Sequence, residues 1–346
     1  MKLDALSMPI NDKDTITGSS YSDLNILHKI FFRNIATDDW GSFKISPWAA
    51  SLIIIGFFAV ILMFVSGVLI LQITAVIFVL ITLVIGVIFI MRETKTLLKN
   101  QAMEEIRLNA LANDNGWTYV RNTKTVNKTG TMFTLGLARQ LSNVITAPNF
   151  QVGEYNSTYD KSKSERIYKF GYIEIPLKRN IPNMLLDTKN NNMSIFGMEL
   201  SNLPVKYDKS QVVSLEGDFD KFYTLYAPKG YDADVRYVFT PDLMQLLIAE
   251  SNSTDVEIVD NTMYLYLGSY DLIQPIFWKR LERILATIGQ KIERQTKNYE
   301  DDNAPNGGVA VKGRRLLRRR VSIFIIIIVV LDLLFELTRL LGIFNN

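Results

Sequence analysis

The stretch ISPWAASLIIIGFFAVILMFVSGVLILQITAVIFVLITLVIGVIFIM, from Ile45 to Met91, contains no Asp, Glu, Lys, Arg or His. As one continuous helix it would extend about 70 Å, more than twice the ~30 Å hydrocarbon core of a bilayer. Two crossings joined by a tight turn fit this length. The sequence therefore predicts a transmembrane helical hairpin over 45–91. Its turn falls within 66–74, at either Ser66–Gly67 or Gln72–Thr74, and the sequence leaves both positions open.

Basic residues flank both outer ends of this apolar run, whereas the turn region carries no charge. The flanking residues are Lys29, Arg33 and Lys44 before the run, and Arg92, Lys95 and Lys99 after it. Loops rich in Lys and Arg stay on the cytoplasmic side of a membrane. We therefore expect both ends of the hairpin, and the folded part of the chain that follows, to lie in the cytoplasm of a bacterial cell, at the inner membrane.

A second apolar segment begins at Val321 and follows a dense group of basic residues. This basic flank consists of Lys312, Arg314, Arg315, Arg318, Arg319 and Arg320. The whole chain has a net charge of +3, so the residues outside the flank sum to −3. A nucleic-acid-binding protein would spread its basic charge over a face or groove, so we expect no nucleic-acid partner. The flank instead predicts a third transmembrane helix over 321–343, with anionic lipid headgroups as a secondary contact.

Three charged residues interrupt the last apolar segment. Asp332, Glu336 and Arg339 recur at i, i+4 and i+7, so they share one face of a helix. In one interpretation the crossing is short and these side chains reach the outer interface. In a second, they contact other spans inside the membrane. A third possibility is that 321–343 lies in the interface as an amphipathic helix.

Between the apolar segments the pattern is typical of an α+β domain with a mixed or antiparallel sheet and flanking helices. Period-two alternation predicts strands over 150–159, 166–177, 210–216, 222–227 and 235–239. Val256–Val259 and Thr262–Leu267 flank Asp260–Asn261, which predicts a hairpin, with Met263 and Leu265 on one face and Tyr264 and Tyr266 on the other. Helices are predicted over 93–113, from Pro241 onward, and over 272–297.

The remaining segments complete the predicted organisation. We expect a disordered N-terminus over 1–20 and a juxtamembrane amphipathic helix over 21–44, which would lie in the interface next to the hairpin. The cytoplasmic domain then spans 92–298. The Asn-, Gly- and Pro-containing stretch that follows, together with the basic flank, predicts a flexible linker over 299–320.

The sequence offers little support for catalysis. It has no cysteine, and its one histidine is His28 in the predicted juxtamembrane helix, so thiol chemistry and histidine-based triads or metal sites are excluded or unsupported. No phosphate-cradling glycine motif is present. Asp232/Asp234 and Asp255/Glu257 alternate along the chain, and we interpret both pairs as solvated faces of extended segments. We therefore expect no catalytic residue, cofactor or metal.

One part of the domain resembles a known family. The matching residues are Phe219–Ala227, Arg236–Met244, Val256–Ile258 and Tyr264–Tyr266. They are similar to an uncharacterised bacterial membrane family whose members carry a transmembrane hairpin followed by a cytoplasmic α+β domain of unknown function. The resemblance implies this architecture for residues 50–270, and it implies no activity and no site residue.

These observations lead to three alternative functions. The first is a non-enzymatic inner-membrane protein that presents a binding or scaffold domain to a protein partner or to copies of itself. The second is a subunit of a transport or envelope complex that uses Asp332, Glu336 and Arg339. The third is a membrane-bound enzyme that uses acidic residues.

Overall fold

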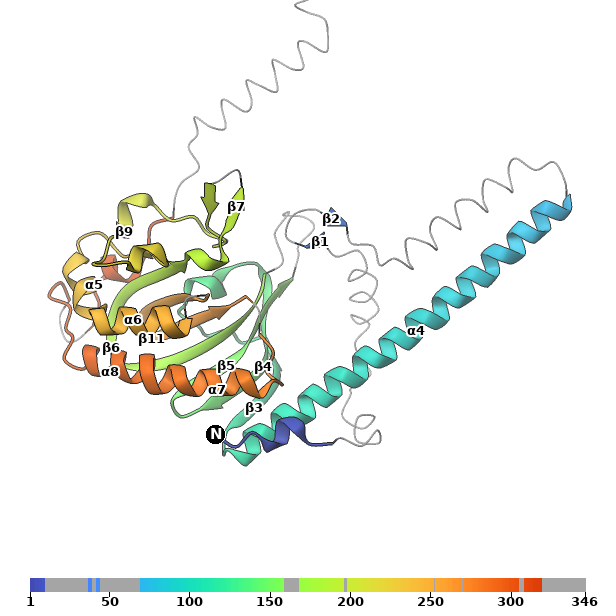
Figure 1. Cartoon of the computed structure of the whole chain (residues 1–346), viewed down its shortest axis with the longest axis horizontal. Helices are drawn as coiled ribbons and strands as arrows, with labels where there is room; N and C mark the ends of the chain where they lie inside the picture. Colours follow the sequence, from blue (N-terminus) through green and yellow to red (C-terminus); the bar gives the residue numbers. More distant parts are fainter. Residues whose placement is uncertain are drawn as a thin grey trace, which may run out of the picture. The chain divides into compact units, whose positions relative to one another are not determined.

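The computed structural model describes residues 1–9, 37–38, 42–43, 69–158, 168–195, 198–251, 253–268, 270–304 and 308–318 (Figure 1). The chain forms two compact units. The first combines Met1–Leu6 with Leu108–Asn346, and the second comprises Ser7–Arg107. The predicted α+β domain belongs to the first unit.

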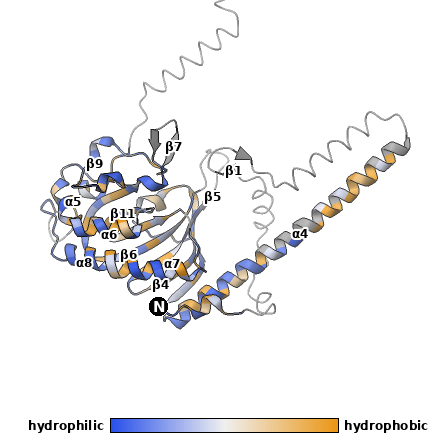
Figure 2. Ribbon diagram, viewed as in Figure 1, coloured by the Kyte–Doolittle hydropathy of each residue, from blue (hydrophilic) through white to orange (hydrophobic). Residues whose placement is uncertain are grey.

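The second unit is dominated by helix α4 (Leu69–Asp114), whose last residues belong to the first unit. Large apolar side chains are exposed along its first half, from Ile73 to Met91 (Figure 2). Two short strands, β1 (Thr37–Asp38) and β2 (Ser42–Phe43), pair antiparallel within the segment predicted as a juxtamembrane helix. The other residues of 10–68 lie outside the described part of the chain. Within the described part, no helix meets the combined requirement of length and hydropathy for a membrane crossing.

The end of α4 confirms the helix predicted over 93–113. Gly116 adopts a positive φ of 69°, and the Trp117 backbone N–H donates to the Ala112 carbonyl at 2.8 Å. A residue in the left-handed region allows the chain to leave a helix while its last carbonyls stay hydrogen-bonded, and glycine adopts that region without a steric penalty. The chain therefore enters the sheet directly after Gly116.

The domain is built on a seven-stranded sheet in which every pairing is antiparallel. Its strand order is β3-β4-β5-β6-β10-β9, and β11 pairs with β6 outside this order. The strands are β3 (Thr118–Thr123), β4 (Leu137–Ala147), β5 (Phe150–Thr158), β6 (Lys169–Thr188), β9 (Val212–Val213), β10 (Tyr223–Tyr226) and β11 (Asp255–Leu267). This arrangement confirms the α+β class and settles the sheet as antiparallel.

Helices cover one face of the sheet (Figure 1). They are α5 (Asp232–Val238), α6 (Pro241–Ser251), α7 (Pro275–Ile284), the π-helical turn η6 (Leu285–Gly289) and α8 (Gln290–Thr296). The stripe Trp278, Leu281, Ile284, Ile288 and Ile292 is buried in the main core. Together α7, η6 and α8 confirm the predicted helix over 272–297 as one helical stretch, and α6 confirms the helix that begins at Pro241.

The opposite face of the sheet is aromatic and is covered by loops. Tyr264 and Tyr266 of β11 point to this side, whereas Met263 and Leu265 belong to the helix-covered core, which confirms the predicted alternation. The 3-10 helix η2 (Thr131–Thr134) supplies the buried Phe133, and the chain near Tyr207 supplies further cover. The domain therefore has three layers, in the order helices, sheet and loops.

Two local predictions are wrong. Residues 235–239 form part of helix α5 and its C-cap instead of a strand. Val235 and Val238 are buried three residues apart, and Asp232 and Asp234 lie in the positively polarised first turn. A pattern of apolar residues that is only five residues long fits both the period of a helix and the period of a strand. Packing therefore decided between the two.

The predicted hairpin at Asp260–Asn261 is also wrong. Strand β11 continues through both residues and stays paired with β6 on each side. Asp260 takes a positive φ of 50°, and the register jumps from Asp260↔Ile181 to Thr262↔Pro176. Aspartate tolerates the left-handed backbone conformation. Asp260 therefore lies at a β-bulge, opposite extra residues of β6, and not in a hairpin turn.

The two ends of the described domain are held by specific contacts. We expected disorder over 1–20, but Asp4–Ser7 forms the 3-10 helix η1 with Ala5 and Leu6 buried. The Lys2 backbone N–H donates to Asn115 Oδ1, and Asn115 Nδ2 donates to the Lys2 carbonyl, both at 2.8 Å. We expected a flexible linker over 299–320, but Tyr299 and Asp301 are buried within it.

Candidate functional site

The described part of the basic flank lies on the domain surface. Lys312 Nζ donates to Asn303 Oδ1 at 2.9 Å, and it lies 5.6 Å from the centre of the Tyr231 ring. Arg314 Nε lies 3.6 Å from Asp260 Oδ1, so the bulge of β11 carries an ion pair. Arg315 and Arg318 are exposed. Arg319, Arg320, Asp332, Glu336 and Arg339 lie outside the described residues.

Gln211 fixes the end of this flank to the sheet edge. This side chain is 2% exposed and bonds both backbone groups of Leu317. Its Nε2 donates to the Leu317 carbonyl, and its Oε1 accepts from the Leu317 N–H, each at 2.8 Å. The Asp208 N–H donates to the same carbonyl at 3.0 Å, and Tyr207 pairs with Arg318 in an antiparallel bridge. We call this set of contacts the Gln211 clamp.

Asp301 anchors the start of the same segment. Its carboxylate accepts hydrogen bonds from the Ala310 N–H and the Tyr231 hydroxyl, each at 2.9 Å, and from the Asn303 N–H at 2.8 Å. Burial alone would raise the pKa of Asp301, but these bonds outweigh it and lower the pKa. The carboxylate is therefore ionised at neutral pH and ties 299–310 to the domain.

Three carboxyl groups are buried on the loop-covered face of β6 and β11. The pairing Val256↔Leu186 places Asp255 directly opposite Asp187, and Glu257 follows on the same face. Burial raises the pKa of Asp187 to about 6. Burial also raises the pKa of Asp255 to about 7, and the neighbouring Asp187 adds to that shift. The interpretation of Asp255 and Glu257 as a solvated pair is wrong, because they are 4% and 0% exposed.

Two of these carboxyl groups, Glu257 and Asp255, hold neighbouring segments by hydrogen bonds. Glu257 accepts from the Thr131 N–H at 2.8 Å and from the Tyr266 hydroxyl at 2.6 Å, which fixes η2 on the sheet. Asp255 accepts from the Thr188 N–H at 2.9 Å and from Asn191 Nδ2 at 3.3 Å. Their hydrogen bonds therefore account for their burial as structural attachments.

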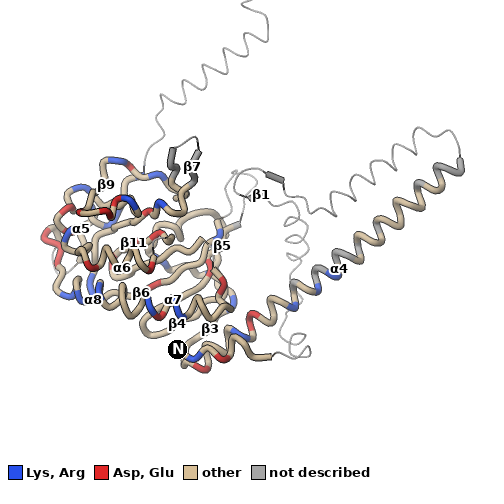
Figure 3. Tube along the Cα trace, in the orientation of Figure 1, with Lys and Arg blue, Asp and Glu red and all other residues tan. Residues whose placement is uncertain are grey.

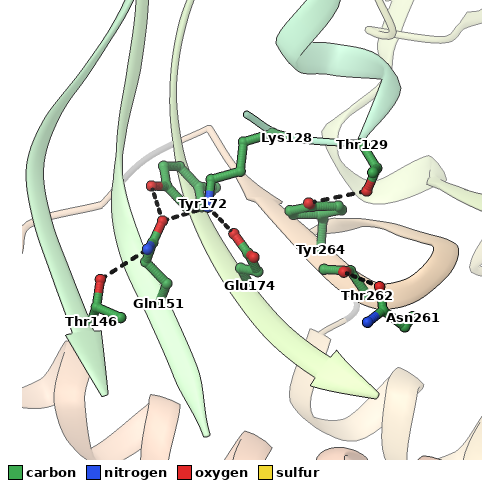
Figure 4. Close-up of polar contacts among 9 residues, drawn as sticks. All are labelled: Lys128, Thr129, Thr146, Gln151, Tyr172, Glu174, Asn261, Thr262 and Tyr264. Carbon is green, nitrogen blue, oxygen red and sulfur yellow. Dashed lines mark hydrogen bonds and ion pairs between the residues drawn. The ribbon is translucent and has the colours of Figure 1, made fainter. Parts of the chain in front are cut away.

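A second polar network lies nearby on β5 and β6 (Figure 4). Lys128, whose side chain is 9% exposed, forms an ion pair with Glu174 and donates to Gln151 Oε1. The Tyr172 hydroxyl donates to the same Gln151 oxygen at 2.8 Å, and Lys128 Nζ lies 5.5 Å from the centre of the Tyr172 ring. This network holds Lys128, and with it the chain segment just before η2, against β5 and β6.

Aromatic rings fill the space between the two networks. Phe133 lies at their centre, with ring centroids 5.1 to 5.9 Å from those of Tyr155, Phe170, Tyr172, Tyr264 and Tyr266. Burial raises the pKa of Tyr155 and Tyr264 to about 12 and raises that of Tyr266 well above its ordinary value. These hydroxyls therefore stay protonated at physiological pH, and those of Tyr155 and Tyr266 donate to the Leu135 carbonyl and the Glu257 carboxylate.

The acidic side chains of the described residues do not gather into a metal site. Within them, no set of three or more His, Cys, Asp or Glu side chains is placed to hold a metal ion. Asp232 and Asp234 lie in α5 rather than on a strand, and Asp234 accepts from the Tyr299 hydroxyl at 2.6 Å. The acidic residues of the sheet face fasten loops. The exposed surface that tertiary contacts bring together is the basic flank held by the Gln211 clamp.

Sequence reasoning identified the basic flank but missed the residues that position it. Gln211 is the second residue of the strand predicted over 210–216, and its local pattern gives no sign of a bond to residue 317. Asp187 and Lys128 were also missed, because the carboxyl groups that lie beside them, those of Asp255 and Glu174, are more than forty residues away in sequence. Local spacing carries no information on such pairs.

Comparison with known proteins gives limited information. No protein-family model matches the chain, and no curated protein matches it. Among solved structures, it is similar to the crystal structure of the mycobacterial trehalose monomycolate transport factor A, TtfA. The two are 12% identical, the match covers 56% of this chain and 94% of that chain, and the TM-score is 0.36. A likeness at this level carries no argument on function.

Proposed function

We propose that this chain is a non-enzymatic integral protein of a bacterial inner membrane that presents its α+β domain at the cytoplasmic surface as a binding or scaffold domain. The membrane anchor in this proposal is the hairpin over 45–91, with a third helix over 321–343. The partner is another protein or a second copy of the chain, in addition to membrane lipids.

The observation that carries the proposal is the packing of the N-terminal residues into the domain. Ala5 and Leu6 are buried, and Asn115 bonds both backbone groups of Lys2, so Met1–Leu6 shares one compact unit with the chain after Leu108. A chain that leaves and rejoins one unit can cross a membrane only an even number of times in between. This favours a hairpin over 45–91 and is independent of the charge argument.

The exposed side chains of α4 support an apolar environment for this run. Ile73, Leu80, Val84 and Ile88 are each more than half exposed, and Met91 reaches 66%. Figure 2 draws this part of the helix as hydrophobic and the part toward Asp114 as mostly hydrophilic. A continuous exposed apolar surface of this kind is costly in water and marks a partner or a membrane.

Charge gives the orientation of the proposed anchor. Basic residues precede and follow the hairpin, and the basic flank from Lys312 to Arg320 precedes the last apolar segment. The positive-inside rule then favours a cytoplasmic domain, and anionic headgroups are the lipids that such a flank attracts. Because buried carboxyl groups and protonated tyrosines serve the fold, the residues described here favour binding over catalysis.

Labelling of single cysteines tests this topology, because the chain has none of its own. Ser7→Cys and Asn149→Cys each place a thiol at an exposed position of the described chain. Asn345→Cys places one after the last apolar segment. In intact cells, an impermeant maleimide should label only the thiol at 345, and all three should react after lysis.

Three outcomes would contradict the proposal. Labelling at 149 in intact cells would reverse the orientation. Different labelling at 7 and 149 would exclude the hairpin, because Ser7 directly follows Met1–Leu6, which shares one unit with residue 149, and one unit cannot lie on both sides of the membrane. Release of the unmodified chain from membranes by alkaline carbonate would exclude an integral anchor.

A second candidate is a subunit of a transport or envelope complex. The i, i+4, i+7 spacing of Asp332, Glu336 and Arg339 favours it, because a charged stripe inside a membrane needs polar partners. We expect Asp332→Leu with Glu336→Leu to abolish in-membrane crosslinks to other membrane proteins. Unchanged crosslinks in this variant, relative to an Asn345→Leu control, would remove this role.

A further inference from the structure

The Gln211 clamp brings two separate segments into one exposed surface. Residues 205–213 and 309–318 are far apart in sequence, yet Tyr207 bridges Arg318 and Gln211 bonds the backbone of Leu317. The basic flank is therefore held against η4 (Lys209–Gln211) and β9. Sequence alone had placed the flank on a flexible linker.

The joined surface is strongly basic. Residues 205–213 and 309–318 contain six cations and one acid, Asp208. The Asp208 carboxylate accepts from the Ser210 N–H at 2.9 Å and from the Ser210 hydroxyl at 2.7 Å, so it is partly engaged within the surface. Basic residues follow the chain around β9 in Figure 3. The cations are Lys206, Lys209, Lys312, Arg314, Arg315 and Arg318.

Exposed apolar side chains lie among these cations. Leu317 is 53% exposed, Val212 is 44% exposed and Val311 is 83% exposed. Cations with interspersed apolar side chains match the interface of an anionic bilayer, where the charges meet headgroups and the apolar groups reach the acyl boundary. A free anion in solution would use the cations and leave the apolar groups without a partner.

Chain length keeps this surface near the proposed anchor. Only Arg319 and Arg320 separate Arg318 from Val321, where the last apolar segment begins. Three residues of extended chain reach about 10 Å, which is comparable to the distance over which charge acts at physiological ionic strength. If 321–343 enters the membrane, the clamped surface is held at the headgroup level.

We propose that the surface formed by Lys206, Lys209, Val212, Arg315, Leu317 and Arg318 rests on anionic lipid headgroups and sets the orientation of the domain on the membrane. This inference rests on the proposed function, since it requires the anchor. The inference adds a second lipid-binding segment, 206–212, to the proposed function. It also fixes which face of the domain contacts the bilayer.

The test uses the full-length chain in nanodiscs of phosphatidylcholine alone or with about one third phosphatidylglycerol. Ser210→Cys carries an environment-sensitive dye, and Asn149→Cys on the turn between β4 and β5 carries the same dye as a control. Lipids with a nitroxide headgroup serve as quenchers. We expect quenching at 210 to be at least threefold stronger in the anionic discs than at neutral charge, and quenching at 149 to be weak in both.

Charge removal completes the test. Lys209→Gln with Arg315→Gln should lower quenching at 210 at least twofold in the anionic discs. The matched control Lys229→Gln with Lys279→Gln removes the same charge from other exposed positions and should leave quenching unchanged. Equal quenching at 210 in both lipid compositions, or no effect of the Lys209/Arg315 change, would overturn the proposed surface. A chain that is not retained in discs after an alkaline wash would instead overturn the proposed function, and the surface with it.

Discussion

At the residue scale, the loop-covered face of the sheet is held by ionisable groups whose burial changes their chemistry. Asp187 and Asp255 face each other across two strands, and both are nearly inaccessible to water. Asp187 Oδ1 has no hydrogen-bond partner within the described chain. Two buried carboxylates side by side repel each other, so the pair holds a proton more tightly than free aspartate does.

This pair should make the domain more stable in mild acid. The pKa values of about 6 and 7 in the folded state exceed the ordinary value of 3.8, so the folded state binds protons more tightly than the unfolded state. The corresponding stability is fully present below about pH 4 and is lost as the pH rises through 6 to 7. We expect the full chain in non-ionic detergent to unfold at a higher temperature at pH 5 than at pH 8, measured by tryptophan fluorescence.

Substitution of the pair provides the control. Asp187→Asn with Asp255→Asn should weaken the dependence between pH 5 and pH 8, because neither amide titrates, while Glu257, whose pKa burial also raises, stays in place. Asp301 has a lowered pKa, so its contribution disappears only at more acidic pH and does not interfere with this window. An identical pH dependence in the wild type and the double variant would show that the pair is not responsible.

At the element scale, side chains replace strand pairing where the secondary structure ends. Strand β9 has two residues, and beyond it Gln211 pairs with the backbone of Leu317 as a neighbouring strand would. Likewise, Asp260 accommodates the bulge of β11 and carries the ion pair with Arg314. These two positions decide the path of the chain from the sheet to the basic flank.

Replacing Gln211 should free residues 315–318 from the edge of the sheet. Gln211→Leu keeps the apolar volume but leaves the Leu317 N–H without its partner and weakens the bonding of its carbonyl, at a cost of about 1–3 kcal/mol. We expect hydrogen exchange to become faster over 315–318 in the full chain, with little change in β6 and β11. Gln290→Leu, at an exposed helix position, is the matched control. Unchanged exchange at 317 would contradict the clamp.

At the scale of the whole molecule, the first residues and the chain after Leu108 form one unit although the apolar run separates them in sequence. The N-terminal residues contribute core side chains to the domain, and the proposed hairpin is an insertion between two parts of the same fold. The proposed anchor therefore lies, in sequence, between two parts of one domain.

Truncation of Leu6 should destabilise the entire domain. This side chain is 3% exposed and belongs to the main core, so Leu6→Ala should lower the free energy of unfolding by about 2–5 kcal/mol. Ser7→Ala, next to it and exposed, should change stability by less than about 0.5 kcal/mol. Denaturant unfolding of the full chain measures both. Equal stability of Leu6→Ala and the wild type would show that the N-terminal segment is not part of the fold.

Sequence was enough to predict the α+β class, the helical state of 93–113, the helices that begin near residues 241 and 272, and the faces of Met263–Tyr266, because each depends on a local period of apolar residues. The fold was needed to show that Asp260 lies at a bulge, that residues 235–239 form part of a helix and its C-cap, and that Asp255 and Glu257 are buried. It alone revealed the contacts of Leu6 with the core and of Gln211 with Leu317. These outcomes depend on which distant segment packs on a residue, and neighbours in sequence do not encode that.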